Sequence, residues 1–145
     1  MLKNLRRKDI LYPELSYEIV GCAFDVFNEL GPGFHEKYYQ RALAESFKNK
    51  NLKFSEQAGH PLKYKGIIIG RQYLDFLVED KIIVEIKKGN IFSKRHVDQV
   101  MNYLKTNNLK LAILINFTNN GIVSKRIINI NSKFVSIRNS LMSHD

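Results

Sequence analysis

The strongest constraint on the fold of this chain is the segment LKLAILINF at residues 109–117. It has the length of a strand and is almost continuously apolar, which is typical of a β-strand covered on both faces. A helix is expected before it, because Ser93 can serve as an N-cap and the Asn107-Asn108 pair can end the helix. The apolar stripe of that helix consists of Val97, Val100, Met101 and Leu104. With a strand in front of the helix, residues 109–117 would be reached by a parallel crossover.

Two amphipathic helices are predicted nearer the N-terminus. In residues 16–30, apolar side chains recur every three or four positions, and the pattern stops at Gly31-Pro32. A second helix at about residues 35–48 has the same spacing. Its buried side chains are expected to be Tyr39, Leu43 and Phe47.

The middle of the chain is rich in β-forming residues. A strand is predicted near residues 52–57, Gly66 indicates a turn within PLKYKGIIIG, and a hairpin follows in YLDFLVEDKIIVEIKKGN. SKRIINI, at residues 124–130, is expected to form an edge strand.

These segments indicate an α/β or α+β fold with the order α-α-β-β-β-α-β and a mixed central β-sheet flanked by helices. The chain has 145 residues, of which 44% are hydrophobic, so it is about one domain long and can bury a core. We expect a single domain over residues 1–145, with its core at about residues 16–130 and with the hairpin as the central pair of strands.

The hairpin carries three charges among its apolar residues: Asp75, Glu85 and Lys87. If the turn is the three-residue loop EDK, Asp75 lies opposite Glu85, and Lys87 points to the same face. A two-residue turn would instead pair Asp75 with Val84 and would leave Glu85 on the other face as an ordinary surface charge. The sequence is compatible with both registers.

Two facing carboxylates repel each other unless a cation or a proton intervenes. They are suited to Mg²⁺ or Mn²⁺, which bind one or two carboxylates together with water and phosphate oxygens. A lysine beside them, here Lys87, can orient or deprotonate the attacking water and stabilise charge on a phosphate. Zinc is not expected, because none of the four histidines is paired with the single cysteine, Cys22.

The predicted third helix adds further polar side chains. Gln99 and Tyr103 are four residues apart, so they project from one face, and His96 can share that side. For Gln99 and His96, a solvated polar face is the simpler interpretation. Glu36 lies in the first turn of the second helix, where negative charge is ordinary helix chemistry.

The charge balance indicates a polyanionic partner. The chain has 23 Lys and Arg against 14 Asp and Glu, a formal net charge of +9. Such a charge favours nucleic acid as the partner, although a basic surface also serves solubility. The residues expected to contact nucleic acid are Lys88, Lys94, Arg95, Lys125 and Arg126.

A cytoplasmic location is expected. Cys22 is the only cysteine, so no intrachain disulfide can form. The N-terminal MLKNLRRKDI has no apolar stretch behind its charges, and no apolar run approaches membrane-spanning length. Neither a signal peptide nor a membrane-spanning helix is therefore expected.

Five segments in order resemble the GxxExxY family of PD-(D/E)XK nuclease-like proteins. The segment GFHEKYY contains Gly33, Glu36 and Tyr39 in the G-x-x-E-x-x-Y spacing, and YKG, LDFLVEDKIIVEIK, HVDQVMNYL and ILINF follow it. The resemblance covers nearly the whole chain. Gln99 and Tyr103 further resemble the QxxxY helix motif of RecB-like nucleases.

This resemblance implies a metal-dependent phosphodiester hydrolase with a Mg²⁺ or Mn²⁺ cofactor. It also implies roles for six residues: Asp75, Glu85 and Glu36 near the metal, Lys87 as the catalytic lysine, and Gln99 and Tyr103 as supporting residues. Leu74 occupies the position of the motif's proline, which supplies no ligand.

The leading hypothesis is a nuclease acting on DNA, with a homodimer as a possible assembly that would pair two active sites. One alternative is a non-catalytic nucleic-acid-binding module that retains the nuclease fold. A more distant alternative is an interaction protein whose charges are all solvated.

Overall fold

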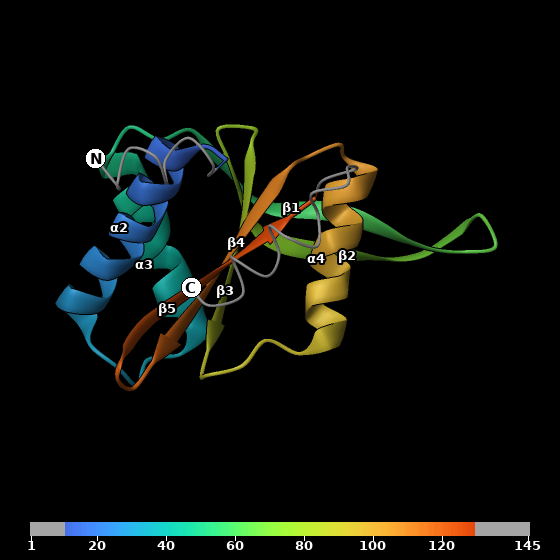
Figure 1. Cartoon of the computed structure of the whole chain (residues 1–145). Helices are drawn as coiled ribbons and strands as arrows, with labels where there is room; N and C mark the ends of the chain where they lie inside the picture. Colours follow the sequence, from blue (N-terminus) through green and yellow to red (C-terminus); the bar gives the residue numbers. More distant parts are fainter. Residues whose placement is uncertain (1–10, 130–145) are drawn as a thin grey trace.

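The computed structural model of this protein describes residues 11–129 (Figure 1). The elements in this part of the chain are α2 (Pro13–Leu30), α3 (Glu36–Asn49), β1 (Phe54–Tyr64), β2 (Ile67–Val78), β3 (Ile82–Lys88), α4 (Lys94–Thr106), β4 (Leu111–Thr118) and β5 (Gly121–Ile128). Their order agrees with the predicted α-α-β-β-β-α-β, to which β5 adds the expected last strand. The fold class is therefore confirmed as mixed α and β.

The five strands form one sheet in the order β1-β2-β3-β4-β5. All neighbouring strands are antiparallel except β3 and β4, which are parallel and joined through α4. This is the predicted crossover. β3, the second strand of the charged hairpin, lies at the centre of the sheet.

Helices cover both faces of the sheet (Figure 1). The core on one face, here called the α2–α3 core, includes Phe76, Val84 and Ile113 together with side chains of α2 and α3. The core on the other face, the α4 core, includes Leu104 of α4 and Leu114 of β4. Every residue of β4 is buried, as predicted for a strand between two layers of helices.

The helices agree closely with the sequence patterns. α2 begins at Pro13, three residues before the predicted start, because a proline at the first helical position has a suitable φ and needs no hydrogen-bond acceptor. Ser93 caps α4 as expected, and its hydroxyl accepts a hydrogen bond from the His96 N–H at 3.1 Å. Among residues 11–129, no helix is both long and apolar enough to cross a membrane.

The first strand differs from the prediction. We expected a short strand near residues 52–57, but β1 continues without interruption through Pro61 to Tyr64. β1 is an edge strand, and a proline can be accommodated there because one side of the strand needs no ladder hydrogen bonds. The expected turn at Gly66 is confirmed: Lys65 and Gly66 both have positive φ and join β1 to β2.

Candidate active site

The register of the β2–β3 hairpin is the one given by a three-residue loop. Val78 pairs with Ile82, and Phe76 pairs with Val84. The alternative two-residue turn, which would have paired Asp75 with Val84, is therefore wrong. Asp75 and Glu85 follow immediately after the last pair of the ladder.

Beyond Phe76 and Val84 the two strands no longer pair, and side-chain carboxylates replace the ladder bonds. The Asp75 N–H donates a hydrogen bond to Glu85 Oε1 at 2.5 Å. The Ile86 N–H donates to Asp75 Oδ2 at 2.8 Å. Each carboxylate thus accepts a hydrogen bond from the backbone of the opposite strand, and these bonds hold the two side chains near each other.

A third carboxylate reaches the same edge of β3. Glu36, in the first turn of α3, accepts a hydrogen bond from the Lys88 N–H at its Oε1, at 3.1 Å. Asp75 and Glu36 therefore cap two amides of β3, two residues apart, on the edge that β2 leaves free. Glu36, Asp75 and Glu85 are called the carboxylate group below.

The environment of Asp75 disfavours its charged form. Burial is the largest cause, and the negative charges of Glu85 and, to a smaller extent, Glu36 act in the same direction. The hydrogen bond from Ile86 lowers the pKa, but burial and the neighbouring negative charges outweigh it and raise the pKa of Asp75 to about 8. A proton or a cation at this position would relieve the repulsion.

His96 is the residue of this site that the sequence argument did not select. Its Nε2 lies 2.8 Å from Glu85 Oε2, an ion-pair distance when the imidazole is protonated, although the pair lacks hydrogen-bond geometry. The ring also stacks on Phe92 with a centroid separation of 5.4 Å. The signal was present in the sequence, because His96 precedes Gln99 by three residues on the helix that follows β3.

Lys87 and Gln99 lie on elements that border the carboxylate group. Alternation along β3 puts Glu85 and Lys87 on the face of Ile83, which packs in the α4 core. Gln99 is one turn beyond His96 on α4, and both Lys87 and Gln99 are half-buried. Within the described residues, neither side chain forms a hydrogen bond or an ion pair.

Tyr103 occupies a different environment from the one expected. Its side chain is buried in the α4 core, and its ring meets the His60 ring edge-on with centroids 5.5 Å apart. Burial raises the pKa of its hydroxyl. The contacts of Tyr103 therefore connect α4 with β1 rather than with the carboxylate group.

Tyr39, the tyrosine of the GxxExxY pattern, has a clear structural part. Its hydroxyl donates a hydrogen bond to the Gly31 carbonyl at 2.6 Å, and the Phe34 N–H donates to the same hydroxyl at 3.3 Å. Its ring stacks on Phe117 of β4 with centroids 4.2 Å apart. Tyr39 thus fixes the loop before α3, and with it the position from which Glu36 reaches β3.

The basic residues predicted to bind nucleic acid fall into two groups. Lys94 and Arg95, at the start of α4, and Lys125 on β5 are exposed. The other two have partners within the chain, because Lys88 Nζ lies 3.4 Å from the Gly33 carbonyl and Arg126 donates to the Leu11 carbonyl at 2.7 Å.

Lys125 and Arg126 also lie on opposite faces of β5. Lys125 pairs with Leu114 of the α4 core, whereas Arg126 pairs with Ile113 of the α2–α3 core. Arg126 therefore contributes to packing near Leu11, whereas Lys94, Arg95 and Lys125 are exposed on the side of the sheet that α4 covers.

The donor set fits a magnesium-type ion better than zinc. The described residues contain no cluster of three or more His, Cys, Asp and Glu side chains arranged to hold a metal. Asp75 and Glu85 nevertheless bring hard oxygen donors together at a position where negative charge is disfavoured. Mg²⁺ and Mn²⁺ need only one or two protein carboxylates and take the rest of their ligands from water and phosphate.

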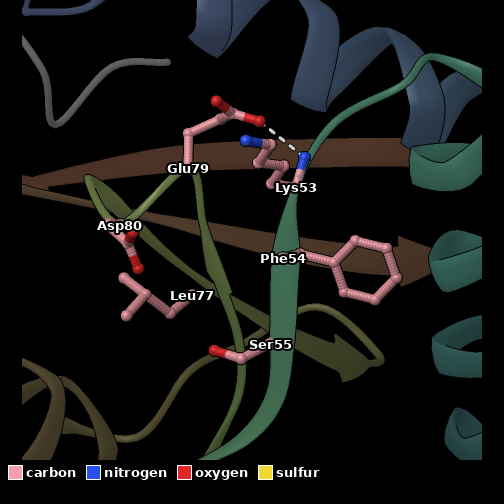
Figure 2. Close-up of a pocket in the computed structure, with 6 residues that line it drawn as sticks. All are labelled: Lys53, Phe54, Ser55, Leu77, Glu79 and Asp80. Carbon is pink, nitrogen blue, oxygen red and sulfur yellow. Dashed lines mark hydrogen bonds between the residues drawn. The ribbon is translucent and has the colours of Figure 1, made fainter.

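A surface pocket elsewhere in the sheet does not belong to this site. Lys53, Phe54, Ser55, Leu77, Glu79 and Asp80 line it at the turn end of the hairpin (Figure 2). The Lys53 N–H donates to Glu79 Oε2 there, which anchors the turn to the start of β1. None of the predicted site residues lines this pocket.

The central strand β3 carries Glu85 and Lys87 next to Asp75 of β2, and the sheet lies between layers of helices. The sequence model of the PD-(D/E)XK nuclease superfamily matches residues 13–129, so the chain belongs to that superfamily. No curated protein matches this chain.

Two solved structures resemble it. One is described as the crystal structure of SSO0001, with 18% identity, a TM-score of 0.50, and coverage of 72% of this chain and 55% of that one. The other is an alkaline exonuclease (LHK-Exo) from Laribacter hongkongensis, with 12% identity, a TM-score of 0.47, and coverage of 92% and 79%. The chain thus spans about half the length of the first structure.

Proposed function

We propose that this protein is a divalent-metal-dependent nuclease that hydrolyses phosphodiester bonds in DNA. The observation that carries the proposal is the meeting of the Asp75 and Glu85 carboxylates where β2 separates from β3. Membership in the PD-(D/E)XK nuclease superfamily supports the same reaction class. The net charge of +9 favours a polyanionic substrate.

In this proposal Asp75 and Glu85 hold Mg²⁺ or Mn²⁺, and Glu36 adds negative charge beside them. The ion, when bound, polarises the phosphate and lowers the pKa of water. Lys87 orients the attacking water and stabilises the charge that develops on the phosphate oxygens. Water adds to phosphorus, the P–O ester bond breaks, and the leaving oxygen takes a proton.

The surrounding residues have supporting functions. Gln99 is one helical turn from His96, which contacts Glu85, so it can hold Lys87 or a phosphate near the carboxylates. Tyr103 supports the helix by packing in the α4 core. We also propose that residues 1–145 act as one domain and that the chain belongs to the GxxExxY group. Two residues of that motif support the assignment, because Glu36 joins α3 to the edge of β3 and Tyr39 fixes the loop before α3.

The proposal is tested with a panel of DNA and RNA substrates in Mg²⁺, Mn²⁺ and EDTA. Cleavage should occur with metal only. Lys87→Ala should lower the cleavage rate by about 100-fold or more, as expected for loss of charge stabilisation, while DNA binding stays close to wild type. Lys110→Ala is the matched control, because Lys110 is exposed and outside the site. Wild-type cleavage by Lys87→Ala would refute the proposal.

A non-catalytic binding module is the alternative function, and the exposed cations Lys94, Arg95 and Lys125 are compatible with it. A Mn²⁺ titration separates the two. A native-state metal site stabilises the fold by about 2.7 kcal/mol at a concentration of 100 Kd, whereas a module without that site shows no such rise in Tm. A chain that binds DNA but shows neither cleavage nor Mn²⁺ stabilisation would be a binding module.

A further inference from the structure

The outer part of the β1–β2 hairpin projects beyond the rest of the sheet (Figure 1). β1 and β2 pair along most of their length, up to Tyr64 opposite Ile67, whereas β2 pairs with β3 only from Phe76 to Val78. Every residue from 62 to 71 is exposed. Residues 62–71 are called the hairpin arm below.

The hairpin arm exposes a group of large apolar side chains. Ile67 and Ile69 are 67% and 63% exposed, and Leu62, Tyr64 and Ile68 are exposed as well. Single exposed apolar residues are common, but five large ones within eight residues of sequence are typical of an interaction surface. The arm is therefore built to be covered by a partner.

The charge of the arm identifies the kind of partner. Lys63, Lys65 and Arg71 lie among its apolar residues, and the sequence contains no Asp or Glu from residue 57 to residue 74. Residues 99–144 also contain no Asp or Glu, so the arm shares this basic character with the C-terminal third of the sequence. A surface with cations, apolar side chains and no carboxylates complements a nucleic acid, which offers phosphates together with apolar base faces and methyl groups.

The shape of the arm fits the groove of a duplex. It is a two-stranded antiparallel ribbon with a tight turn, since Lys65 and Gly66 have φ of 49° and 82°. At about 3.3 Å per residue, the arm's three residues of β1 (62–64) and five of β2 (67–71) extend roughly 10–16 Å. The major groove of B-DNA is about 12 Å wide and admits a two-stranded β-ribbon.

A register shift changes the direction of the side chains within the arm. Leu62 pairs with Gly70 and Lys63 with Ile68, so Ile69 has no residue opposite it. Such a bulge increases the local twist and changes the direction in which the neighbouring side chains point. The twisted end of the ribbon thus presents isoleucines and lysines together at its tip.

The arm is connected to the carboxylate group through β2, which carries both the second strand of the arm and Asp75. Arg71, at the base of the arm, is four residues from Asp75, which is about 13 Å along a strand. Tyr73, between them, is exposed. A duplex with one phosphate at Asp75 and Glu85 therefore lies within reach of the arm.

We propose that the hairpin arm inserts into the major groove of double-stranded DNA and holds the duplex with a phosphodiester at the carboxylate group. The identity of the duplex as substrate rests on the proposed nuclease function, whereas binding of the duplex by the arm does not. A second copy of the chain and an anionic membrane are the competing occupants of the same surface.

The test measures binding of a fluorescent 24-base-pair duplex by anisotropy in EDTA, so that binding is separated from cleavage. One variant removes the charges of the arm (Lys63→Gln, Lys65→Gln and Arg71→Gln). A second removes its apolar tip (Ile67→Thr, Ile68→Thr and Ile69→Thr). The matched control removes three exposed charges of α3 and its C-cap instead: Arg41→Gln, Lys48→Gln and Lys50→Gln.

The charge variant should bind the duplex about tenfold or more weakly, and its plot of log K against log[salt] should be less steep by about 2.7, or 0.9 for each of three phosphates. The isoleucine variant should also weaken duplex binding but leave the salt slope unchanged. In both arm variants, the loss of affinity should be greater for the duplex than for the single strand of the same sequence. The α3 control should bind like wild type.

Wild-type duplex binding by both arm variants would overturn the proposal, as would an equal loss for duplex and single strand. Arm variants that turn a dimer into a monomer in sedimentation while keeping duplex affinity would assign the surface to a second copy. Arm-dependent binding to vesicles of anionic lipid, without effect on the duplex, would assign it to a membrane.

Hydrolysis of bis(p-nitrophenyl) phosphate separates this proposal from the nuclease proposal, because that diester is too small to reach the arm from the carboxylate group. If no phosphodiester is hydrolysed but duplex binding depends on the arm, the arm proposal stands and the nuclease proposal fails. If the small diester is hydrolysed and the arm variants bind duplex like wild type, the nuclease proposal stands and the arm proposal fails.

Discussion

Replacement of Asp75 by asparagine should stabilise the metal-free protein at pH 8 and leave it nearly unchanged at pH 4. Asparagine has the size of aspartate, and its carbonyl oxygen can still accept the hydrogen bond that the Ile86 N–H donates to Asp75 Oδ2 at 2.8 Å. The substitution therefore removes the ionisable group while keeping the contact that holds β2 against β3.

The size of the expected change in the free energy of unfolding follows from the pKa of Asp75, which burial and the Glu85 charge raise from 3.8 to about 8. Between these two pH values the folded protein keeps a proton that the unfolded chain has released, so the free energy of unfolding falls as pH rises. At about 1.4 kcal/mol per pKa unit, the upper limit of the fall is roughly 5 kcal/mol. A fall of about 2–4 kcal/mol is expected, because Asp75 is half-buried and keeps some contact with solvent.

The measurement is urea unfolding in EDTA at pH values from 4 to 9, for wild type, Asp75→Asn and Asp98→Asn. Asp98, an exposed carboxylate of α4, is the control and should follow the wild-type curve. Mg²⁺ at pH 8 should restore stability to wild type but not add stability to Asp75→Asn. If the wild-type and Asp75→Asn curves are parallel from pH 4 to pH 9, burial and the Glu85 charge do not raise the pKa of Asp75 as the structure indicates.

Three further substitutions test the packing around the site. Phe76→Ala should lower the free energy of unfolding in urea by about 3–5 kcal/mol, because Phe76 is fully buried among other aromatic rings; a loss below 1 kcal/mol would mean that this core is not packed as described. Glu79→Ala should cost about 1 kcal/mol in a thermal melt, since it frees the Lys53 N–H at the hairpin turn, and no change would show that this contact is dispensable. Asn116→Ala should cost about 1–3 kcal/mol, because buried Asn116 donates to the Gly89 carbonyl at 2.9 Å; it should also speed amide hydrogen exchange at the start of α4, and unchanged exchange there would count against that anchoring role.

The elements of the fold could be predicted because each depends on a local pattern. The apolar run of β4, the stripe of α4 and its Ser93 cap are encoded by neighbouring residues. The hairpin register was one of two that the sequence allowed, and the structure decided between them. β1 was predicted too short, since the sequence around Pro61 does not reveal that the strand lies at the edge of the sheet.

The contacts of the site depend on residues far apart in the chain. Glu36 meets the backbone of Lys88 across 52 residues, and no local pattern fixes which amide its carboxylate will find. The sequence alone favours a solvated polar face for His96, yet the entry of α4 beside β3 brings it to Glu85. Tyr103 shares a helical stripe with buried residues. Its ring packs against His60 of β1, whereas the motif suggested a role at the site.

The separation of β2 from β3 at Asp75 links the two proposed surfaces of this protein. β2 leaves β3 after Phe76 and continues with β1 as the hairpin arm, so one edge of β3 loses its strand partner. Side-chain carboxylates then cap the freed Ile86 and Lys88 amides. A longer β2–β3 ladder would satisfy the same amides with backbone carbonyls and would leave no reason for acidic side chains to gather there. The same departure of β2 thus creates both the arm that can hold a duplex and the acidic edge that can act on it.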